Sequence, residues 1–156
     1  MKTPGQPLLF MWHEGQASRG PNEIGSCLLR YIRENDIPEN IIAFTDSCGG
    51  QNRNLKICLF WLYVVDDNSN RVSVCDQKFF VPGHSYMSCD RDFGIIEQHK
   101  PRHPNIFIYD DWVELVQGAS KKFTVFKMSL NDIGHVEEIM KSIVYREKDV
   151  DEEKVE

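Results

Sequence analysis

The sequence predicts an α/β domain in which strands and helices alternate and part of the sheet is parallel. The length of 156 residues fits one domain. Apolar residues make up 41% of the chain and charged residues 27%, which is typical of a chain that buries a core. Short β-branched or aromatic runs alternate with segments whose apolar residues recur at helical spacing, and this alternation predicts the fold class.

Two strands and two helices are expected in the first half of the chain. The apolar run after Pro7 and the β-branched run before Asp46 favour strands, and the second strand is expected to be buried. Pro21 favours a helix start, and Asn52 or Asn54 can cap a second helix that is apolar almost all round. The expected strands span residues 8–12 and 41–45, and the expected helices span residues 21–34 and 55–65.

The same alternation continues in the second half. Pro82 and Gly83 stop a strand, Ser88 or Asp90 can cap the next helix, and Pro101 ends that helix. Gly118 is expected to stop a shorter helix. The expected strands span residues 72–81, 106–109 and 123–128, and the expected helices span residues 88–99, 111–116 and about 131–144.

The charge of the chain is unevenly distributed. The net charge is −6, but residues 147–156 carry six acids and two lysines, so only −2 remains for residues 1–146. We therefore expect a structured domain over residues 1–145 and an acidic, disordered tail over residues 146–156. After position 99, basic residues could form a strip that binds nucleic acid or is merely solvated surface: Lys100, Arg102, Lys121, Lys122 and Lys127.

The cysteines and the lack of long apolar runs predict an intracellular, soluble protein. The longest apolar run, residues 57–65, is far shorter than the roughly 18 residues of a membrane span. Five cysteines without a C-x-x-C pair predict neither a disulfide framework nor a zinc knuckle. We expect no membrane partner and no small-molecule cofactor.

The most informative motif is the string from Asp46 to Asn54, DSCGGQNRN. An acid at the carboxyl end of a buried strand, followed by two glycines, lies where α/β proteins place their sites. The alternative is that Asp46 only caps a turn in which Gly49 and Gly50 supply the backbone angles. The motif is neither a Walker loop nor a dinucleotide fingerprint.

A second motif runs from residue 82 to residue 97 and contains His84, Asp90 and Glu97. On a helix that starts near Ser88, Asp90 and Glu97 share a face, and either could meet Asp46 at the edge of the sheet. Paired carboxylates of this kind favour Mg²⁺ or Mn²⁺, with His84 as a flanking ligand, a base or a phosphate contact. The alternatives are that Asp90 caps its helix and that His84 is a hydrogen-bonded turn residue.

These strings resemble a eukaryotic domain-of-unknown-function family found in transposon-derived proteins. The resemblance rests on a Trp-His-Glu string followed by ASRGP, on TDSCGGQNRN, and on FVPGHS followed by Asp90 and by Phe93-Gly94, and it covers the chain to about residue 145. It implies an RNase H-like three-layer α/β fold of the transposase or integrase type. In that fold Asp46 matches the strand-end metal ligand and Asp90 matches the acid of the last core helix. Glu97 and Glu14 are weaker matches as metal ligands.

The chain departs from the family pattern at its N-terminus. An RNase H-like core begins with a hairpin whose first strand supplies a catalytic acid, and this chain opens at what resembles the third strand. We therefore expect a domain that lacks its first hairpin and is truncated at the N-terminus.

The function that the resemblance implies is metal-dependent cleavage or strand transfer at a DNA phosphodiester, in the nucleus. Asp46, Asp90 and His84 would be the catalytic residues. The residues expected to contact nucleic acid are Gln51, Asn52, Arg53, Asn54, Lys100 and Arg102. For the asparagines the alternative is helix capping, and for the whole domain it is an inactive, domesticated domain that binds nucleic acid or protein.

Overall fold

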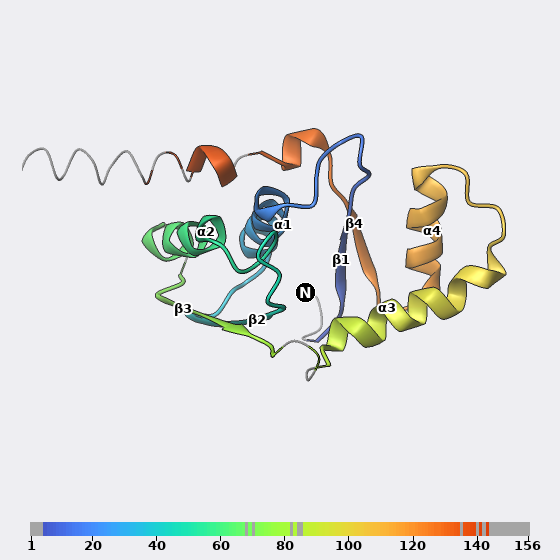
Figure 1. Cartoon of the computed structure of the whole chain (residues 1–156), viewed down its shortest axis with the longest axis horizontal. Helices are drawn as coiled ribbons and strands as arrows, with labels where there is room; N and C mark the ends of the chain where they lie inside the picture. The colour runs from blue at the N-terminus through green and yellow to red at the C-terminus, as the bar shows by residue number, and fades with distance from the viewer. Residues whose placement is uncertain are drawn as a thin grey trace, which may run out of the picture. The chain divides into compact units, whose positions relative to one another are not determined.

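The chain divides into two compact units, each with helices and one pair of parallel strands (Figure 1). The computed structural model describes residues 5–67, 69, 71–81, 83, 86–134, 136–139, 141 and 143. Unit 1 joins residues 1–16 to residues 85–129, and unit 2 joins residues 17–84 to residues 130–156. The expected α/β class with parallel strands is confirmed. Within the described ranges, no helix combines the length and apolarity that crossing a membrane requires.

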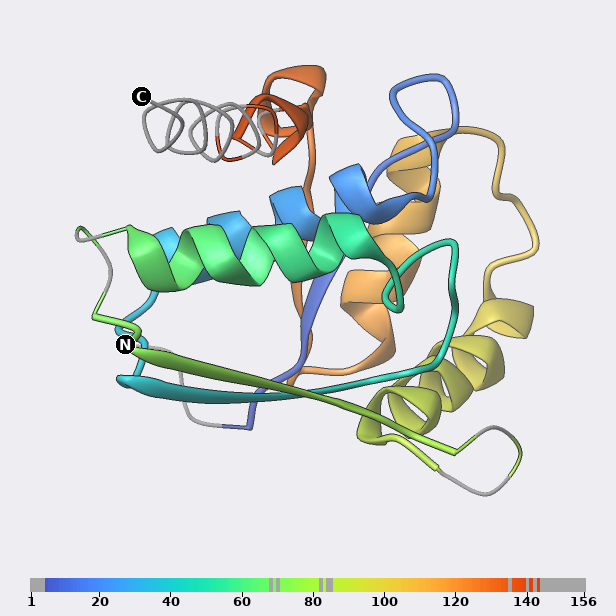
Figure 2. The ribbon, with the colours of Figure 1, turned by 60° about the vertical axis from the view of Figure 1, so that its left-hand side comes forward.

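Unit 2 is built around a strand, helix, strand arrangement. The strands β2 (Asn40–Thr45) and β3 (Val74–Phe79) pair in parallel, with Thr45 opposite Phe79, and α2 (Leu55–Asp66) connects them. Figure 2 shows α2 and α1 (Pro21–Glu34) on the same side of this strand pair. The two helices and the inward faces of the strands enclose a core. Its fully buried members include Ile57, Phe60, Val64 and Val136.

The strand β2 is half-buried rather than buried on both faces as expected. Ile41 and Ala43 pack against the core of unit 2, whereas Ile42 and Phe44 are 56% and 58% exposed. The alternation follows from the strand geometry, because successive side chains point to opposite faces and the helices cover one face of β2. A continuous apolar run in the sequence therefore did not mean burial on both sides.

The start of α1 follows the predicted pattern. Pro21 occupies the first turn, where its missing N–H costs nothing, and the buried Glu23 carboxylate accepts a 2.8 Å hydrogen bond from the Gly20 N–H. Further along, Gly25 allows the core to close, because a Cβ there would lie 2.9 Å from a methyl group of Val136. The glycine therefore serves helix packing at this position.

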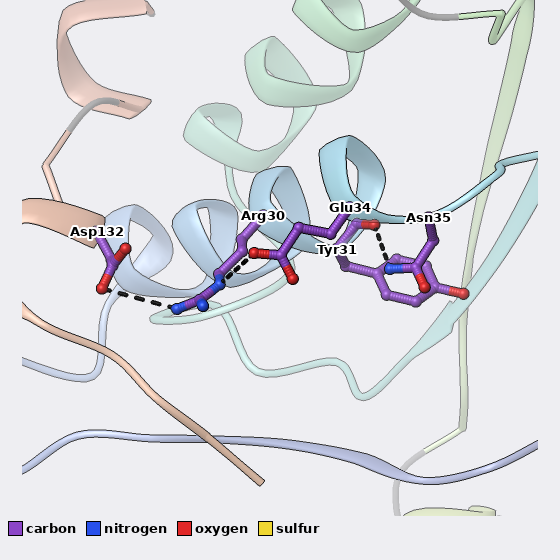
Figure 3. Close-up of polar contacts among 5 residues, drawn as sticks. All are labelled: Arg30, Tyr31, Glu34, Asn35 and Asp132. Carbon is purple, nitrogen blue, oxygen red and sulfur yellow. Dashed lines mark hydrogen bonds and ion pairs between the residues drawn. The ribbon is translucent and has the colours of Figure 1, made fainter. Parts of the chain in front are cut away.

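Arg30 fastens the 3₁₀ turn η2 (Leu130–Asp132) to α1, as Figure 3 shows. Its Nε lies 2.8 Å from Glu34 Oε1, and its Nη1 lies 3.7 Å from Asp132 Oδ2. At the end of the same helix, Asn35 Nδ2 donates a 2.7 Å hydrogen bond to the Tyr31 carbonyl. The ion pair between Arg30 and Asp132 joins parts of unit 2 that are far apart in the sequence, whereas the other two contacts are local to the helix.

Unit 1 pairs the beginning of the chain with a late strand. β1 (Leu8–Met11) lies parallel to β4 (Thr124–Lys127), and α3 (Ser88–His99), the 3₁₀ turn η1 (Lys100–Arg102) and α4 (Tyr109–Ala119) come between them in the sequence. Residues from α3, α4 and the segment before β4 form the core, against which Leu9 and Met11 of β1 pack. Tyr109 Oη donates a 2.7 Å hydrogen bond to the Met11 carbonyl and fastens α4 to β1.

Three expected elements were wrong in extent or type. Residues 106–109 do not form a strand, because Asp111 Oδ2 accepts hydrogen bonds from the N–H groups of Phe107 and Ile108 and so caps α4. The helix α4 runs through Gly118 to Ala119 instead of stopping at residue 116. The expected helix from residue 131 is interrupted by Gly134, whose φ of +121° is outside the helical region, and residues 136–139 are helical. The acidic tail lies outside the described residues.

Candidate functional site

The 46–54 loop lies at the carboxyl ends of two paired parallel strands. It leaves β2 after Thr45 and enters α2 at Leu55. The end of β3 lies beside it, since the Thr45 carbonyl accepts a 3.0 Å hydrogen bond from the Phe80 N–H. This is the edge at which α/β proteins place their ligand sites, as the sequence predicted for this loop.

Two acceptors near the start of the loop organise its backbone. The Cys48 carbonyl accepts hydrogen bonds from the N–H groups of Gln51, Asn52 and Arg53, at 3.2, 2.8 and 2.9 Å. Asp46 Oδ1 accepts from the Cys48 N–H at 3.3 Å and from Asn52 Nδ2 at 2.5 Å. Asp46 therefore builds the turn, which was the alternative to its role as a metal ligand. Its second oxygen, Oδ2, has no hydrogen-bond partner among the described residues.

Asn54 connects the loop to the helix that follows it. Its Oδ1 accepts a 3.1 Å hydrogen bond from the Ile57 N–H and caps α2, as the capping alternative predicted. Its Nδ2 donates to the carbonyls of Gly49 and Gln51, at 3.0 and 3.1 Å. One side chain thus holds both the glycine pair and the first turn of the helix.

Gln77, outside the motif, and Ser47, within it, hold the loop against β3 and the residue that follows it, Phe80. Gln77 Nε2 donates to the Asn52 carbonyl at 3.2 Å and to Thr45 Oγ1 at 3.3 Å, and Ser47 Oγ donates to the Phe80 carbonyl at 2.8 Å. Sequence reasoning did not single out Gln77. The available signal was a polar residue two positions after Cys75, on the strand face that packs inward.

The loop presents several hydrogen-bond donors that have no acceptor among the described residues. These donors are the backbone N–H groups of Gly49 and Gly50, the side-chain amide of Gln51 and, in the first turn of α2, the Lys56 ammonium group. The Arg53 guanidinium lies 5.6 Å from the centre of the Phe79 ring and has no carboxylate partner within the described part of the chain. Arg53 and Lys56 are exposed. The sequence had indicated Gln51 and Arg53 but not Lys56.

The candidate residues in unit 1 are engaged in local contacts. Asp90 Oδ2 accepts a 2.8 Å hydrogen bond from the Met87 N–H. The N-cap of α3 is Met87 rather than Ser88 or Asp90, and Asp90 supports the helix start from the first turn. Glu97 Oε2 lies 3.8 Å from Lys100 Nζ, which also lies 5.2 Å from the centre of the Trp112 ring. Asp90 and Glu97 are both exposed.

The remaining candidate residues, Arg102, Glu14 and His84, are not brought together by the described part of the chain. Arg102 is exposed in the turn η1, and Glu14 is exposed in the turn that the hydrogen bond from Gln16 N–H to the His13 carbonyl closes. His84 lies outside the described residues. Asp46 belongs to unit 2, whereas Asp90, Glu97 and Glu14 belong to unit 1, so the expected meeting of these acids stays a prediction.

The carboxylates fit a hydrated divalent ion only as single-oxygen ligands. Asp46 and Asp90 each commit one oxygen to a backbone N–H group and keep one oxygen without a hydrogen bond to a described residue. Mg²⁺ commonly keeps several waters and takes one or two protein carboxylates together with substrate phosphate. Among the described residues no group of three or more His, Cys, Asp or Glu side chains could hold a metal ion, so they do not assemble a two-metal centre by themselves.

Comparisons of the chain with known protein families, with curated proteins and with solved structures gave no match. The resemblance to the transposon-derived family and the RNase H-like fold therefore stay predictions.

Proposed function

We propose that unit 2 binds the phosphate backbone of a nucleic acid through the 46–54 loop and the first turn of α2. The observation that carries the proposal is the group of unsatisfied donors on an otherwise tightly bonded loop. Free backbone N–H groups of a glycine pair, an amide and two cations suit an anion with several oxygens. The start of α2 adds the positive end of a helix dipole.

The rigidity of the loop supports a binding role. Asp46 accepts a hydrogen bond from the loop backbone, and Asn54 and Gln77 donate hydrogen bonds to it. The backbone N–H groups of the loop therefore do not have to be ordered when the ligand binds. Contacts of this type position a protein on a backbone without reading sequence. Binding is therefore expected to depend strongly on salt and weakly on sequence.

The test is fluorescence anisotropy with labelled single-stranded and duplex oligonucleotides over a range of salt concentrations. The double variant R53A/K56A should bind more weakly and should reduce the slope of log affinity against log salt by about 2 on duplex, since each phosphate contact contributes about 0.9. The matched control is K78A, which removes an exposed cation on β3 that pairs with Asp76. An R53A/K56A variant with the wild-type affinity and slope would refute the proposal, and so would a K78A variant that loses as much as R53A/K56A does.

A second candidate function is metal-dependent cleavage or strand transfer at a DNA phosphodiester, in an RNase H-like, transposon-derived domain of the nucleus. The uncommitted Asp46 Oδ2 favours it, because this oxygen belongs to the same loop as the proposed phosphate contacts. Bound Mg²⁺ or Mn²⁺ would supply positive charge at the reacting phosphate and lower the pKa of an attacking water. In the intact form of the family that the chain resembles, Asp46 would hold the ion, and Asp90 and His84 would complete the site.

Cleavage of a labelled oligonucleotide in Mg²⁺ or Mn²⁺ tests this second function. D46N replaces the free carboxylate oxygen by an amide but can still accept a hydrogen bond from the Cys48 N–H, so it should retain binding and lose cleavage. E14Q, at a weaker candidate, is the comparison variant. Cleavage that persists in D46N would refute the catalytic role of Asp46. If the wild-type protein binds the oligonucleotide but does not cleave it in either metal ion, binding of nucleic acid without catalysis is the function.

A further inference from the structure

Two histidines at the end of α3 bring their imidazole nitrogens together. His99 Nε2 and His103 Nε2 are 2.9 Å apart, and the ring centres are 4.6 Å apart. His99 is the last residue of α3, and His103 closes the turn η1 by donating its N–H to the Lys100 carbonyl at 3.0 Å. The backbone on both sides of the pair is therefore hydrogen-bonded, and Pro101 restricts it further.

The separation of the nitrogens matches that of two ligands on one metal ion. Ligand nitrogens about 2.0 Å from an ion and at right angles to each other lie about 2.9 Å apart, whereas tetrahedral ligands at the same distance lie about 3.3 Å apart. The observed 2.9 Å thus suits neighbouring positions of the tetragonal geometry that Cu²⁺ and Ni²⁺ prefer. In the ion-free pair one protonated Nε2 donates a hydrogen bond to the other Nε2. When both nitrogens bind an ion, the proton of the donor ring is carried on its Nδ1 instead.

The surroundings leave the two nitrogens open to a solvated ion. His103 is exposed and His99 is half-buried. Gly118 of α4 lies beside His99, since a Cβ there would be in contact with His99 Nε2 at 3.5 Å, and the lack of a side chain at Gly118 leaves space next to this nitrogen. The neighbouring cation Lys100 is directed to Glu97 and to the Trp112 ring. The other positions around the ion can be filled by water.

We propose that His99 and His103 form a two-histidine chelate for a divalent late transition-metal ion, with Cu²⁺ bound more tightly than Zn²⁺. The site differs from the proposed Mg²⁺ or Mn²⁺ site in its ligands, because imidazole suits copper, nickel and zinc whereas carboxylate oxygen suits magnesium and manganese. It belongs entirely to unit 1 and does not depend on the function proposed for the 46–54 loop.

Calorimetric titration with Cu²⁺, Ni²⁺ and Zn²⁺ tests the chelate in the full chain. The parent protein for all variants is the full chain with its other accessible ligands replaced, so that they do not bind the ion. In this background the exposed cysteines Cys48, Cys58 and Cys89 are replaced by Ser, and the histidines His84 and His135 are replaced by Gln. One ion should bind, with Cu²⁺ the tightest. H99Q and H103Q should each lose about a hundredfold in affinity, because a chelate becomes a single ligand. H13Q, at another histidine of unit 1, should retain the affinity of the background.

A measurement on the unaltered chain accompanies the variants. Paramagnetic Cu²⁺ should broaden the ring proton resonances of His99 and His103 before those of His13. Equal broadening of all three histidines, or a Cu²⁺ affinity in H103Q equal to that of the background, would overturn the proposal. So would Zn²⁺ binding more tightly than Cu²⁺.

Discussion

Replacement of Asn54 should destabilise unit 2 more than the loss of an ordinary surface amide. Asn54→Ala removes the cap of α2, which is worth about 1 kcal/mol, and two hydrogen bonds to the loop carbonyls, each worth about 0.5 to 1.5 kcal/mol. The free energy of unfolding should fall by about 2 to 4 kcal/mol. The side chain is partly buried, so water does not replace all three bonds.

Asn54→Asp separates the two contributions. The carboxylate still accepts from the Ile57 N–H and interacts favourably with the helix dipole, but it cannot donate to the carbonyls of Gly49 and Gln51. We therefore expect the stability of Asn54→Asp to lie between the wild type and Asn54→Ala. If Asn54→Asp is as unstable as Asn54→Ala, the cap of α2 contributes nothing measurable.

Urea unfolding followed by tryptophan fluorescence is the assay. Trp61 lies in the core of unit 2, whereas Trp12 and Trp112 belong to unit 1, so replacing the latter two with Phe makes the signal report unit 2. With a slope of about 1 to 2 kcal/mol per molar urea, Asn54→Ala should lower the midpoint by about 1 to 4 M. An unchanged midpoint would refute the structural role assigned to Asn54.

Three further predictions concern packing, pH and thiol reactivity. Gly25→Ala should destabilise unit 2 by about 1 kcal/mol, because crowding against the core outweighs the gain in helix propensity, whereas Gly94→Ala, with open space around it, should stabilise α3 by about 0.5 to 1 kcal/mol in thermal unfolding. Hydrogen bonds from two backbone N–H groups lower the pKa of Asp111 below its ordinary value of 3.8. The stability that the Asp111 carboxylate contributes is therefore present above pH 3.8 and is lost as the pH falls through the lower pKa of the folded state. The melting temperature of Asp111→Asn should accordingly fall less than that of the wild type between about pH 4 and pH 2. Burial raises the pKa of Cys27 to about 12, so iodoacetamide at pH 8 should label the exposed Cys58 and spare Cys27, as peptide mass spectrometry can determine. Wild-type stability in Gly25→Ala, parallel pH profiles, or equal labelling of the two thiols would contradict the respective prediction.

The elements that the sequence predicted well are those with local signals. Pro21, Glu23 and the helical spacing of apolar residues determine α1, and Asn54 before an apolar run determines α2. The turn role of Asp46 was also among the interpretations of the sequence, because an acid before a glycine pair commonly bonds to the backbone that follows it.

The sequence could not reveal features that depend on distant partners. β1 and β4 pair across more than 100 residues, and no local pattern shows which strands become neighbours. Residues 106–109 resemble a strand in composition, yet Phe107 is 85% exposed and Asp111 commits the segment to a helix start. Gln77 is an ordinary polar residue until the strand β3 lies beside the loop that it holds.

The two proposed sites can be distinguished by the chemistry of the ion. The 46–54 loop offers one free carboxylate oxygen and a set of donors that favour phosphate, so a divalent ion should bind there only together with a nucleic acid and should be Mg²⁺ or Mn²⁺. The His99–His103 pair offers two nitrogens and no anion, so Cu²⁺ should bind there without any nucleic acid. Because each site lies in a different unit, H103Q should leave oligonucleotide binding unchanged, and R53A/K56A should leave Cu²⁺ binding unchanged. A loss of both activities in either variant would mean that the two sites are not independent.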